Sequence, residues 1–158
     1  MRYLISICKK SDKEAQRHQK NFAVLLVNVE NLFKIQQQFG YVIGDNWLKM
    51  LGAMLKTTVR ESDTVAWDGK QRFIILLEEI AQAKDAGLVG QMILFKLMQP
   101  TKFAEHEVYG EVNIGIAIYP EDHHEAEHLI QMAEIALERA EKQGRGGQCC
   151  FLIPSYKI

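Results

Sequence analysis

The sequence predicts an α+β fold, an α/β sandwich in which a central, mostly antiparallel sheet of about five strands is wrapped by helices in the order βααββαβαβ. The first observation is a nearly uninterrupted apolar run from Phe22 to Val29, which is typical of a strand buried on both faces. The second is an Asp68-Gly69 turn between two runs rich in β-branched and aromatic residues, which indicates a β-hairpin. The third is that helical segments separate the remaining strands, and such long crossovers permit parallel pairs.

Length and composition fit one domain over residues 1–158, because 47% hydrophobic residues can supply a core. Nineteen basic and 20 acidic residues leave a formal net charge of -1, so we expect no nucleic-acid partner. The apolar runs are far shorter than a membrane-spanning helix requires, and no secretory signal follows the first residue. Three cysteines without disulfide or metal spacing favour a reducing, cytoplasmic location.

Four elements are expected before the hairpin. Mixed apolar and charged positions within residues 1–20 predict an N-terminal helix over 3–20, and the strand over 22–29 follows it. Apolar residues spaced by three and four from Leu32 to Phe39 predict a short amphipathic helix that stops at Gly40. A second helix is predicted to follow Gly44-Asp45, with large apolar residues on its inner face.

After the hairpin, the pattern alternates between helix and strand. Helical spacing predicts a helix from Ala83 to Met98. Period-two alternation from Val108 to Tyr119 predicts one long strand. A helix with one apolar face is predicted from Glu125 to Lys142, and a last short strand from Cys149 to Ile153.

Five segments carry motifs in a consistent order and spacing. They are Asn28 to Ile35 with Phe39-Gly40 and Gly44-Asp45, Arg60 to Asp63, Gly69 to Phe73, Asn113 to Pro120, and Ala133 to Leu137 with Gly144-Arg145. Together they resemble the GGDEF family, the diguanylate cyclases that condense two GTP into cyclic di-GMP, from about Phe22 to Gly146. The resemblance implies a central sheet wrapped by helices, similar to the palm of nucleotidyl cyclases.

The same register shows where this chain departs from the family signature. Two glycines followed by two acids are replaced by Gly69-Lys70-Gln71-Arg72-Phe73, which shares only the first glycine and the phenylalanine. In the family, the acid matched by Gln71 and an aspartate matched by Asn28 ligate the divalent metals, and two neutral amides replace both charges. The resemblance therefore implies that Mg²⁺ binding and the catalytic positions are lost. Lys70 is expected to crowd the substrate at a place where the family has bare backbone.

Positions that contact the nucleotide in the family differ as well. The family's two phosphate-binding lysines are matched by Phe33 and Glu141, which removes two cations and adds an anion. Gln36 stands at the guanine-contacting asparagine, Asp45 retains the guanine-contacting aspartate, and Arg145 retains a phosphate-side arginine. The last three residues are candidate nucleotide-binding residues.

The resemblance implies a catalytically inactive GGDEF-like domain in bacterial cyclic di-GMP signalling, which regulates a neighbouring domain or binds a partner protein. A first alternative is a cyclic di-GMP receptor, because Arg60 and Asp63 match the family's inhibitory site and can pair with a phosphate and a guanine edge. The same two residues also fit a local ion pair. A second alternative is a weak residual diguanylate cyclase. Since the chain begins after the family's opening motif, the resemblance also implies a fragment of a longer multidomain protein.

Overall fold

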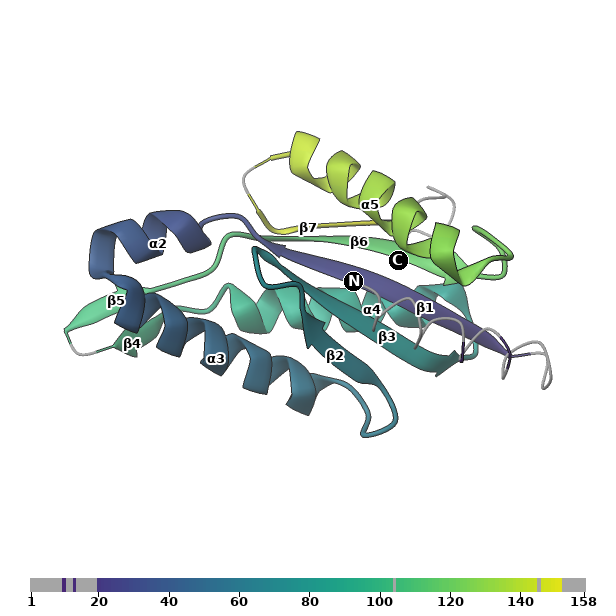
Figure 1. The fold of residues 1–158 in the computed structure, drawn as a ribbon, viewed down its shortest axis with the longest axis horizontal. Helices are drawn as coiled ribbons and strands as arrows, with labels where there is room; N and C mark the ends of the chain where they lie inside the picture. Colours follow the sequence, from purple (N-terminus) through teal and green to yellow (C-terminus); the bar gives the residue numbers. More distant parts are fainter. Residues whose placement is uncertain (1–9, 11–12, 14–19, 104, 145, 152–158) are drawn as a thin grey trace.

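The structure is a computed structural model that describes residues 10, 13, 20–103, 105–144 and 146–151 (Figure 1). The helix predicted over 3–20 lies almost entirely outside the described residues, as do Arg145 and the end of the last predicted strand. Within the described residues, five strands form one sheet, two further strands form a separate hairpin, and four helices pack around the sheet. Among the helices of this part of the chain, none is both long and apolar enough to cross a membrane.

The main sheet has the strand order β2-β3-β1-β6-β7. Its strands are β1 (Asn21–Val29), β2 (Thr64–Trp67), β3 (Arg72–Ile80), β6 (Val112–Tyr119) and β7 (Gln148–Phe151). The central strand β1 pairs antiparallel with both β3 and β6, and β2 pairs antiparallel with β3. Only the edge strand β7 is parallel to its neighbour β6. The predicted mostly antiparallel α+β fold of five strands is confirmed.

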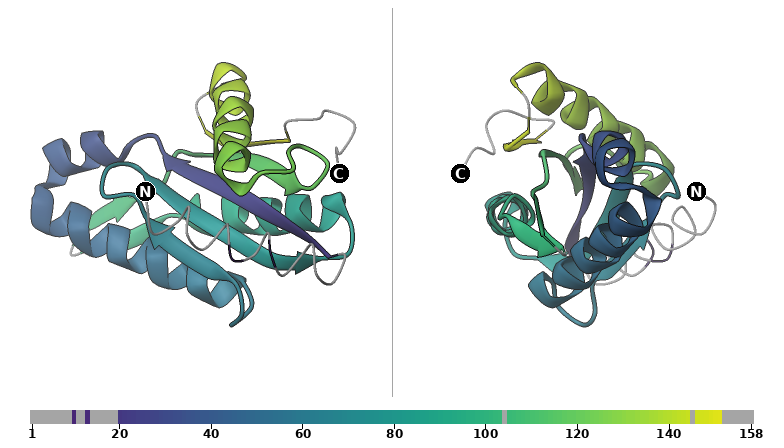
Figure 2. Two further views of the ribbon diagram at one scale, coloured as in Figure 1. Left: turned by 45° about the vertical axis from the view of Figure 1, so that its right-hand side comes forward. Right: turned by 90° about the vertical axis from the view of Figure 1, so that its left-hand side faces the viewer.

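Helices cover both faces of this sheet. They are α2 (Leu32–Phe39), α3 (Tyr41–Thr58), α4 (Ala83–Leu97) and α5 (Ala126–Lys142). Side chains of β1 alternate between two buried clusters: Leu25 packs with residues of α2, α3 and α4, whereas Leu26 packs with residues of α5. Figure 2 shows α5 on one side of the sheet and α3 with α4 on the other. This double coverage explains why β1 is apolar along nearly its whole length.

A glycine in β6 allows α5 to pack close to the sheet. A Cβ atom at Gly115 would lie 2.3 Å from the carbonyl oxygen of Ala133 and 2.4 Å from the backbone nitrogen of Leu137. Both atoms belong to the α5 backbone, which is held by its own hydrogen bonds and has little freedom to move aside. Only glycine fits this position without displacing the helix.

The predicted hairpin is present as β2 and β3, joined by a four-residue loop from Asp68 to Gln71. Gly69 adopts a φ of 85°, in the left-handed region that favours glycine. The carboxylate of Asp68 organises the loop, because its Oδ1 accepts hydrogen bonds from the backbone N–H groups of Lys70, Gln71 and Arg72 at 2.8, 3.0 and 3.1 Å. The Asp-Gly signal thus identified the turn correctly, although the loop is longer than a two-residue turn.

The single strand predicted from Val108 to Tyr119 is wrong at its start. The structure instead has a small hairpin of β4 (Thr101–Phe103) and β5 (His106–Val108), and β6 begins only at Val112. The interruption has a specific cause in Asn31, whose side-chain Nδ2 donates to the carbonyl of Tyr109 at 2.8 Å while its Oδ1 accepts from the N–H of Glu111 at 2.9 Å. These bonds take up backbone groups that a continuous ladder would need.

The predicted start of the second helix is also corrected. We expected this helix to follow Gly44-Asp45, but α3 begins at Tyr41, directly after Gly40 with its φ of 90°. Gly44 lies inside α3, where a Cβ atom would be 2.6 Å from the Cγ of Gln36 on α2. Gly40 is therefore the break between the helices, and Gly44 serves their close packing.

Candidate functional site

The loop of the β2–β3 hairpin lies against the end of β1. The backbone carbonyl of Gln71 accepts a hydrogen bond from the N–H of Val29 at 3.0 Å. In the other direction, the side-chain Nε2 of Gln71 donates to the carbonyls of Val29 at 3.2 Å and Glu30 at 3.4 Å. The amide of Gln71 thus directs its N–H groups at backbone oxygens where β1 ends.

A network of amides and carboxylates surrounds the same end of β1. Asn28 is 5% exposed, and its Nδ2 donates to Oε1 of Glu30 at 2.8 Å and to Oε1 of Glu141 at 3.0 Å. Asn113 lies opposite Asn28 on β6 and donates to the same Glu30 oxygen at 3.1 Å. The Oδ1 of Asn113 accepts from the backbone of Gln148 at 3.1 Å. We call Asn28, Glu30, Gln71, Asn113 and Glu141 the β1 corner.

The sequence predicted part of this group. Asn28, Gln71 and Glu141 were expected to share one site, and the structure brings all three together. Glu30 and Asn113 were not assigned a role from the sequence. A signal was available in the sequence, because Asn113 is a polar residue in an otherwise apolar strand. The structure shows that it is fully buried, and buried polar groups need hydrogen-bond partners.

Charge in the β1 corner is dominated by its two carboxylates. Partial burial raises the pKa of Glu141 above its ordinary value, and the nearby Glu30 carboxylate raises it further. The Arg72 guanidinium and the Asn28 hydrogen bond both hold the pKa of Glu141 down. Arg72 itself pairs with Glu134 on α5 through Nη1 and Oε1 at 3.2 Å, which ties the hairpin to that helix.

As they lie, these donors do not fit a hard divalent cation. Mg²⁺ requires oxygen ligands in a nearly ideal octahedron, with their lone pairs directed at the metal. In the β1 corner, the amide of Asn28 directs N–H groups at both carboxylates, and the amide of Gln71 directs N–H groups at two carbonyls. A cation would have to displace these amide N–H groups from the oxygens. Neither Asn28 nor Gln71 can offer an anionic oxygen in their place.

The remaining positions matched to nucleotide contacts are dispersed over α2 and α3. Phe33 is 61% exposed on α2, so its ring neither packs in the core nor offers a cation. Gln36 is half-buried, and its side chain lies against Gly44 of the neighbouring helix. Asp45 is exposed on the first turns of α3. Arg145 lies outside the described residues.

Arg60 and Asp63 form a closed local pair after α3. The Asp63 side chain is 2% exposed, whereas that of Arg60 is 57% exposed. Oδ2 of Asp63 accepts from the backbone N–H of Arg60 at 2.9 Å and from its Nε at 3.3 Å, while Oδ1 accepts from the backbone N–H of Glu78 at 3.0 Å. Nη2 of Arg60 donates to the backbone carbonyl of Glu79. A cavity of about 330 Å³ adjoins this pair.

The comparisons with known proteins agree with this fold. The family described as "Diguanylate cyclase, GGDEF domain" matches residues 2–147 of this chain. Among solved structures, the GGDEF domain of TpbB from Pseudomonas aeruginosa PAO1 superposes with a TM-score of 0.91 at 25% identity, covering 99% of this chain and 91% of that chain.

Three curated relatives from Pseudomonas aeruginosa are longer than this chain. The bifunctional diguanylate cyclase/cyclic di-GMP phosphodiesterase MucR is 32% identical over 139 residues, which are 88% of this chain and 20% of MucR. Diguanylate cyclase TpbB is 29% identical over 137 residues, 86% of this chain and 32% of TpbB. The cyclic di-GMP phosphodiesterase NbdA is 25% identical over 132 residues, 84% of this chain and 17% of NbdA. The chain thus spans a third or less of each relative. Its sequence match over nearly the whole length, together with the shared fold, shows that the chain belongs to the GGDEF domain family.

Proposed function

We propose that this chain is a catalytically inactive GGDEF domain that acts as a regulatory or scaffold module in bacterial cyclic di-GMP signalling. The observation that carries the proposal is the β1 corner, where the amides of Asn28 and Gln71 direct N–H groups at the oxygens that would otherwise face a metal ion. Phosphoryl and nucleotidyl transfer depends on cations that neutralise charge developing on the phosphates. A corner whose carboxylates already accept hydrogen bonds from the Asn28 amide works against that requirement.

The surroundings of the corner support the same proposal. Phe33 and Glu141 provide no cation for a triphosphate, and the Glu141 carboxylate would repel one. Arg72 is a cation of the hairpin, but its guanidinium is engaged with Glu134. Lys70 is exposed at the tip and adds a long side chain where a nucleotide would need to approach the backbone.

A regulatory role is also consistent with the longer proteins in which similar domains occur. The curated relatives are much longer than this chain, and NbdA is named for phosphodiesterase activity. A GGDEF domain beside another activity can act through contacts with its neighbour, and domain interfaces within one chain commonly permit such coupling. We propose a neighbouring domain or a partner protein in the cytoplasm as the target.

A second candidate function is cyclic di-GMP binding at Arg60 and Asp63. The observation in its favour is the 330 Å³ cavity beside Arg60, whose side chain is 57% exposed, because a phosphate could pair with its guanidinium in exchange for the present contacts to Asp63 and Glu79. The buried carboxylate of Asp63 is already shared between Arg60 and the backbone of Glu78, so a guanine edge would have to compete with these donors. We therefore rank this function below the inactive module.

The decisive experiment separates the three functions. Purified protein is incubated with GTP and Mg²⁺, and cyclic di-GMP is sought by chromatography; the proposal expects none, and product formation refutes it. Calorimetric titration with cyclic di-GMP then tests the receptor, since micromolar binding that is lost in Arg60→Ala supports it. Arg139→Ala, on α5, is the matched control for removal of an arginine.

A restoration experiment tests the physical reasoning. The triple variant Asn28→Asp, Lys70→Gly, Gln71→Glu returns the second glycine and the two metal-ligating acids but leaves Arg72, Phe33 and Glu141 in place. We expect no cyclase activity from this variant, because the triphosphate still lacks its cationic partners. Adding Phe33→Lys and Glu141→Lys is the step that we expect to be necessary for turnover.

A further inference from the structure

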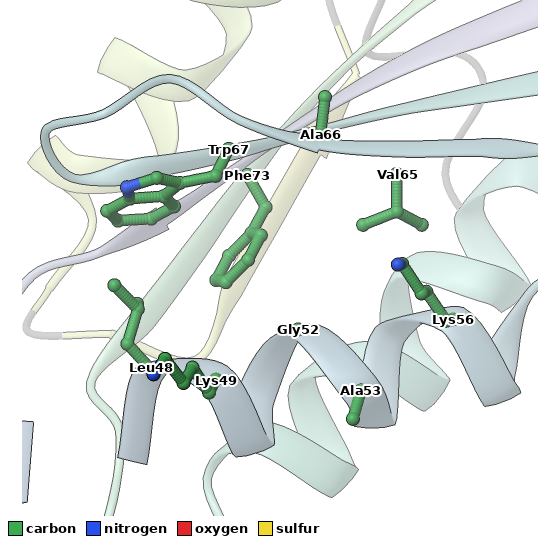
Figure 3. Close-up of a pocket in the computed structure, with 9 residues that line it drawn as sticks. All are labelled: Leu48, Lys49, Gly52, Ala53, Lys56, Val65, Ala66, Trp67 and Phe73. Carbon is green, nitrogen blue, oxygen red and sulfur yellow. The ribbon is translucent and has the colours of Figure 1, made fainter. Parts of the chain in front are cut away.

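A separate cavity lies between α3 and the β2–β3 hairpin (Figure 3). Its volume is about 420 Å³, within the range of about 300–1,000 Å³ typical of small-molecule sites. The helix forms one wall and the two hairpin strands form the other. We call this space the α3–hairpin cavity.

The hairpin wall of the cavity is aromatic. Trp67 and Phe73 are cross-strand partners whose ring centroids lie 4.7 Å apart at an interplanar angle of 55°. Figure 3 shows both rings extending from the hairpin toward α3. On the helix side, a Cβ atom at Gly52 would lie 3.4 Å from Cε1 of Phe73, and Phe73 is only 4% exposed, so its ring packs over this turn of α3 and closes one end of the cavity. Aromatic faces of this kind favour a flat ligand.

The charge of the cavity has one sign. Lys49 and Lys56, about two turns apart on α3, both line it, and no acidic residue does. Figure 3 shows the ammonium group of Lys56 rising from the helix toward Val65 of β2. Among the described residues, neither lysine is within ion-pair distance of a carboxylate. The two cations are therefore available to an anionic ligand.

The cavity is poorly suited to reading a nucleobase. Its lining side chains have no carboxylate, carboxamide or hydroxyl group, and their only polar groups are the two ammonium groups and the indole N–H of Trp67. Gln36 and Asp45, the positions matched to guanine contacts, do not line it. Selection at such a site rests on charge and flat apolar shape, with little hydrogen-bonding specificity.

We propose that the α3–hairpin cavity binds a small organic anion with a flat aromatic body, of the aromatic carboxylate or sulfonate class. The ring lies against the half-buried Trp67, which packs on the buried Phe73, and the acid group pairs with the ammonium groups of Lys49 and Lys56. This site does not depend on whether the domain is catalytically active. Because Trp67 directly precedes the loop from Asp68 to Gln71 and pairs across the hairpin with Phe73, an occupant also braces the hairpin that leads to the β1 corner.

The test uses two probes that share a naphthalene ring, one with an anionic substituent and the other with a neutral one. Naphthalene-2-sulfonate and the neutral naphthalen-2-ol are titrated into the protein by calorimetry, and we expect the sulfonate to bind at least about fivefold more tightly, since two partly exposed ion pairs contribute roughly 0.5 kcal/mol each. Lys49→Gln with Lys56→Gln should remove this preference. Lys84→Gln on α4, which is exposed and outside the cavity, is the matched control and should leave it unchanged.

A second variant tests the location by narrowing the cavity. Gly52→Leu adds a large side chain at a residue that lines the cavity and should abolish sulfonate binding; far-ultraviolet circular dichroism tests whether the variant is folded. If Gly52→Leu does not fold, the double lysine variant decides alone. Equal binding of the two probes, unchanged binding in the double lysine variant, or no sulfonate binding at millimolar concentration overturns the proposal. GMP binding as tightly as the sulfonate, and lost in the same variants, also overturns it, because the cavity would then be a nucleotide site.

Discussion

The replacement Asn28→Asp tests directly how the β1 corner is held together. The Asn28 amide donates hydrogen bonds at 2.8 and 3.0 Å to the carboxylates of Glu30 and Glu141. An aspartate has nearly the same shape but offers oxygen atoms in place of those N–H groups. Two attractive contacts would thus become two contacts between like charges, with only 5% of the residue exposed to water.

The size of the effect follows from these distances. Two unit charges about 3 Å apart interact with about 5 kcal/mol at an effective dielectric constant near 20. Rotation of the exposed Glu141 side chain away from the corner relieves much of this repulsion, while the two lost hydrogen bonds cost about 1 kcal/mol each. We expect a net loss of about 2–4 kcal/mol in the free energy of unfolding at pH 7. For a domain of this length, that corresponds to a Tm lower by about 5–15 °C.

The assay measures Tm with and without a divalent cation. Asn28→Asp would gather three carboxylates, so Mg²⁺ or Mn²⁺ should restore part of the lost stability, by up to about 2.7 kcal/mol at a hundred times the Kd. Wild-type protein should not respond, because its amide N–H groups face the same oxygens. Asn46→Asp, on the exposed surface of α3, controls for the added charge and should shift Tm by less than about 2 °C.

The reasoning would be refuted by either of two results. One is an Asn28→Asp variant as stable as wild type in the absence of divalent cations, which would mean that the amide does not hold the two carboxylates. The other is a wild-type Tm that rises with Mg²⁺ as much as that of the variant. The second result would also contradict the proposed loss of the metal site.

Three further predictions concern stability. Gly115→Ala should lower the free energy of unfolding by more than about 3 kcal/mol in urea titration, because its Cβ would overlap the α5 backbone; Gly69→Ala, with φ 85° but open space around it, should cost only about 1 kcal/mol, and similar losses would contradict this. Asp63→Ala should cost about 3 kcal/mol, since it leaves buried donors without their carboxylate; a neutral result would mean that the pair is dispensable. The raised pKa of Glu141 means that the folded state holds this proton more tightly than the unfolded state, so its contribution to stability is present at low pH and is lost as pH rises through the raised pKa. Glu141→Gln should flatten that decline and stabilise the protein at pH 7 by up to about 0.5 kcal/mol, a small value because the group is exposed; an unchanged pH profile would assign the slope to other groups.

Local sequence patterns correctly predicted those helices, strands and turns whose conformation is not changed by contacts with distant residues. The apolar run of β1 and the Asp68-Gly69 turn each encode their conformation within a few residues, and both predictions are confirmed. The strand expected from Val108 to Tyr119 failed because Asn31, distant in sequence, takes up the backbone groups of its first part. Alternation alone does not reveal such a long-range hydrogen bond.

The residues of the candidate site likewise fall into those that the sequence predicted and those that it did not. Motif register placed Asn28, Gln71 and Glu141 in one corner, since positions that align with a known fold inherit its geometry. The role of Glu30 depends on the side-chain amides of Asn28 on β1 and Asn113 on β6, which both donate to its carboxylate. From the sequence alone, a charged residue directly after a strand is expected only to be exposed to solvent. Whether Arg60 and Asp63 pair with each other or await a ligand was equally open, and the structure shows them paired.

The strand order has a consequence for the protein during its synthesis. The central strand β1 pairs with β3 on one side and β6 on the other, and β6 follows it in the chain only after about 80 residues. At a ribosomal rate of roughly 5–20 residues per second, one edge of the most apolar strand waits on the order of 4–16 s for its partner. A nascent chain of this fold thus passes through a stage with an unpaired hydrophobic edge, where chaperones or early docking of α3 would protect it from aggregation.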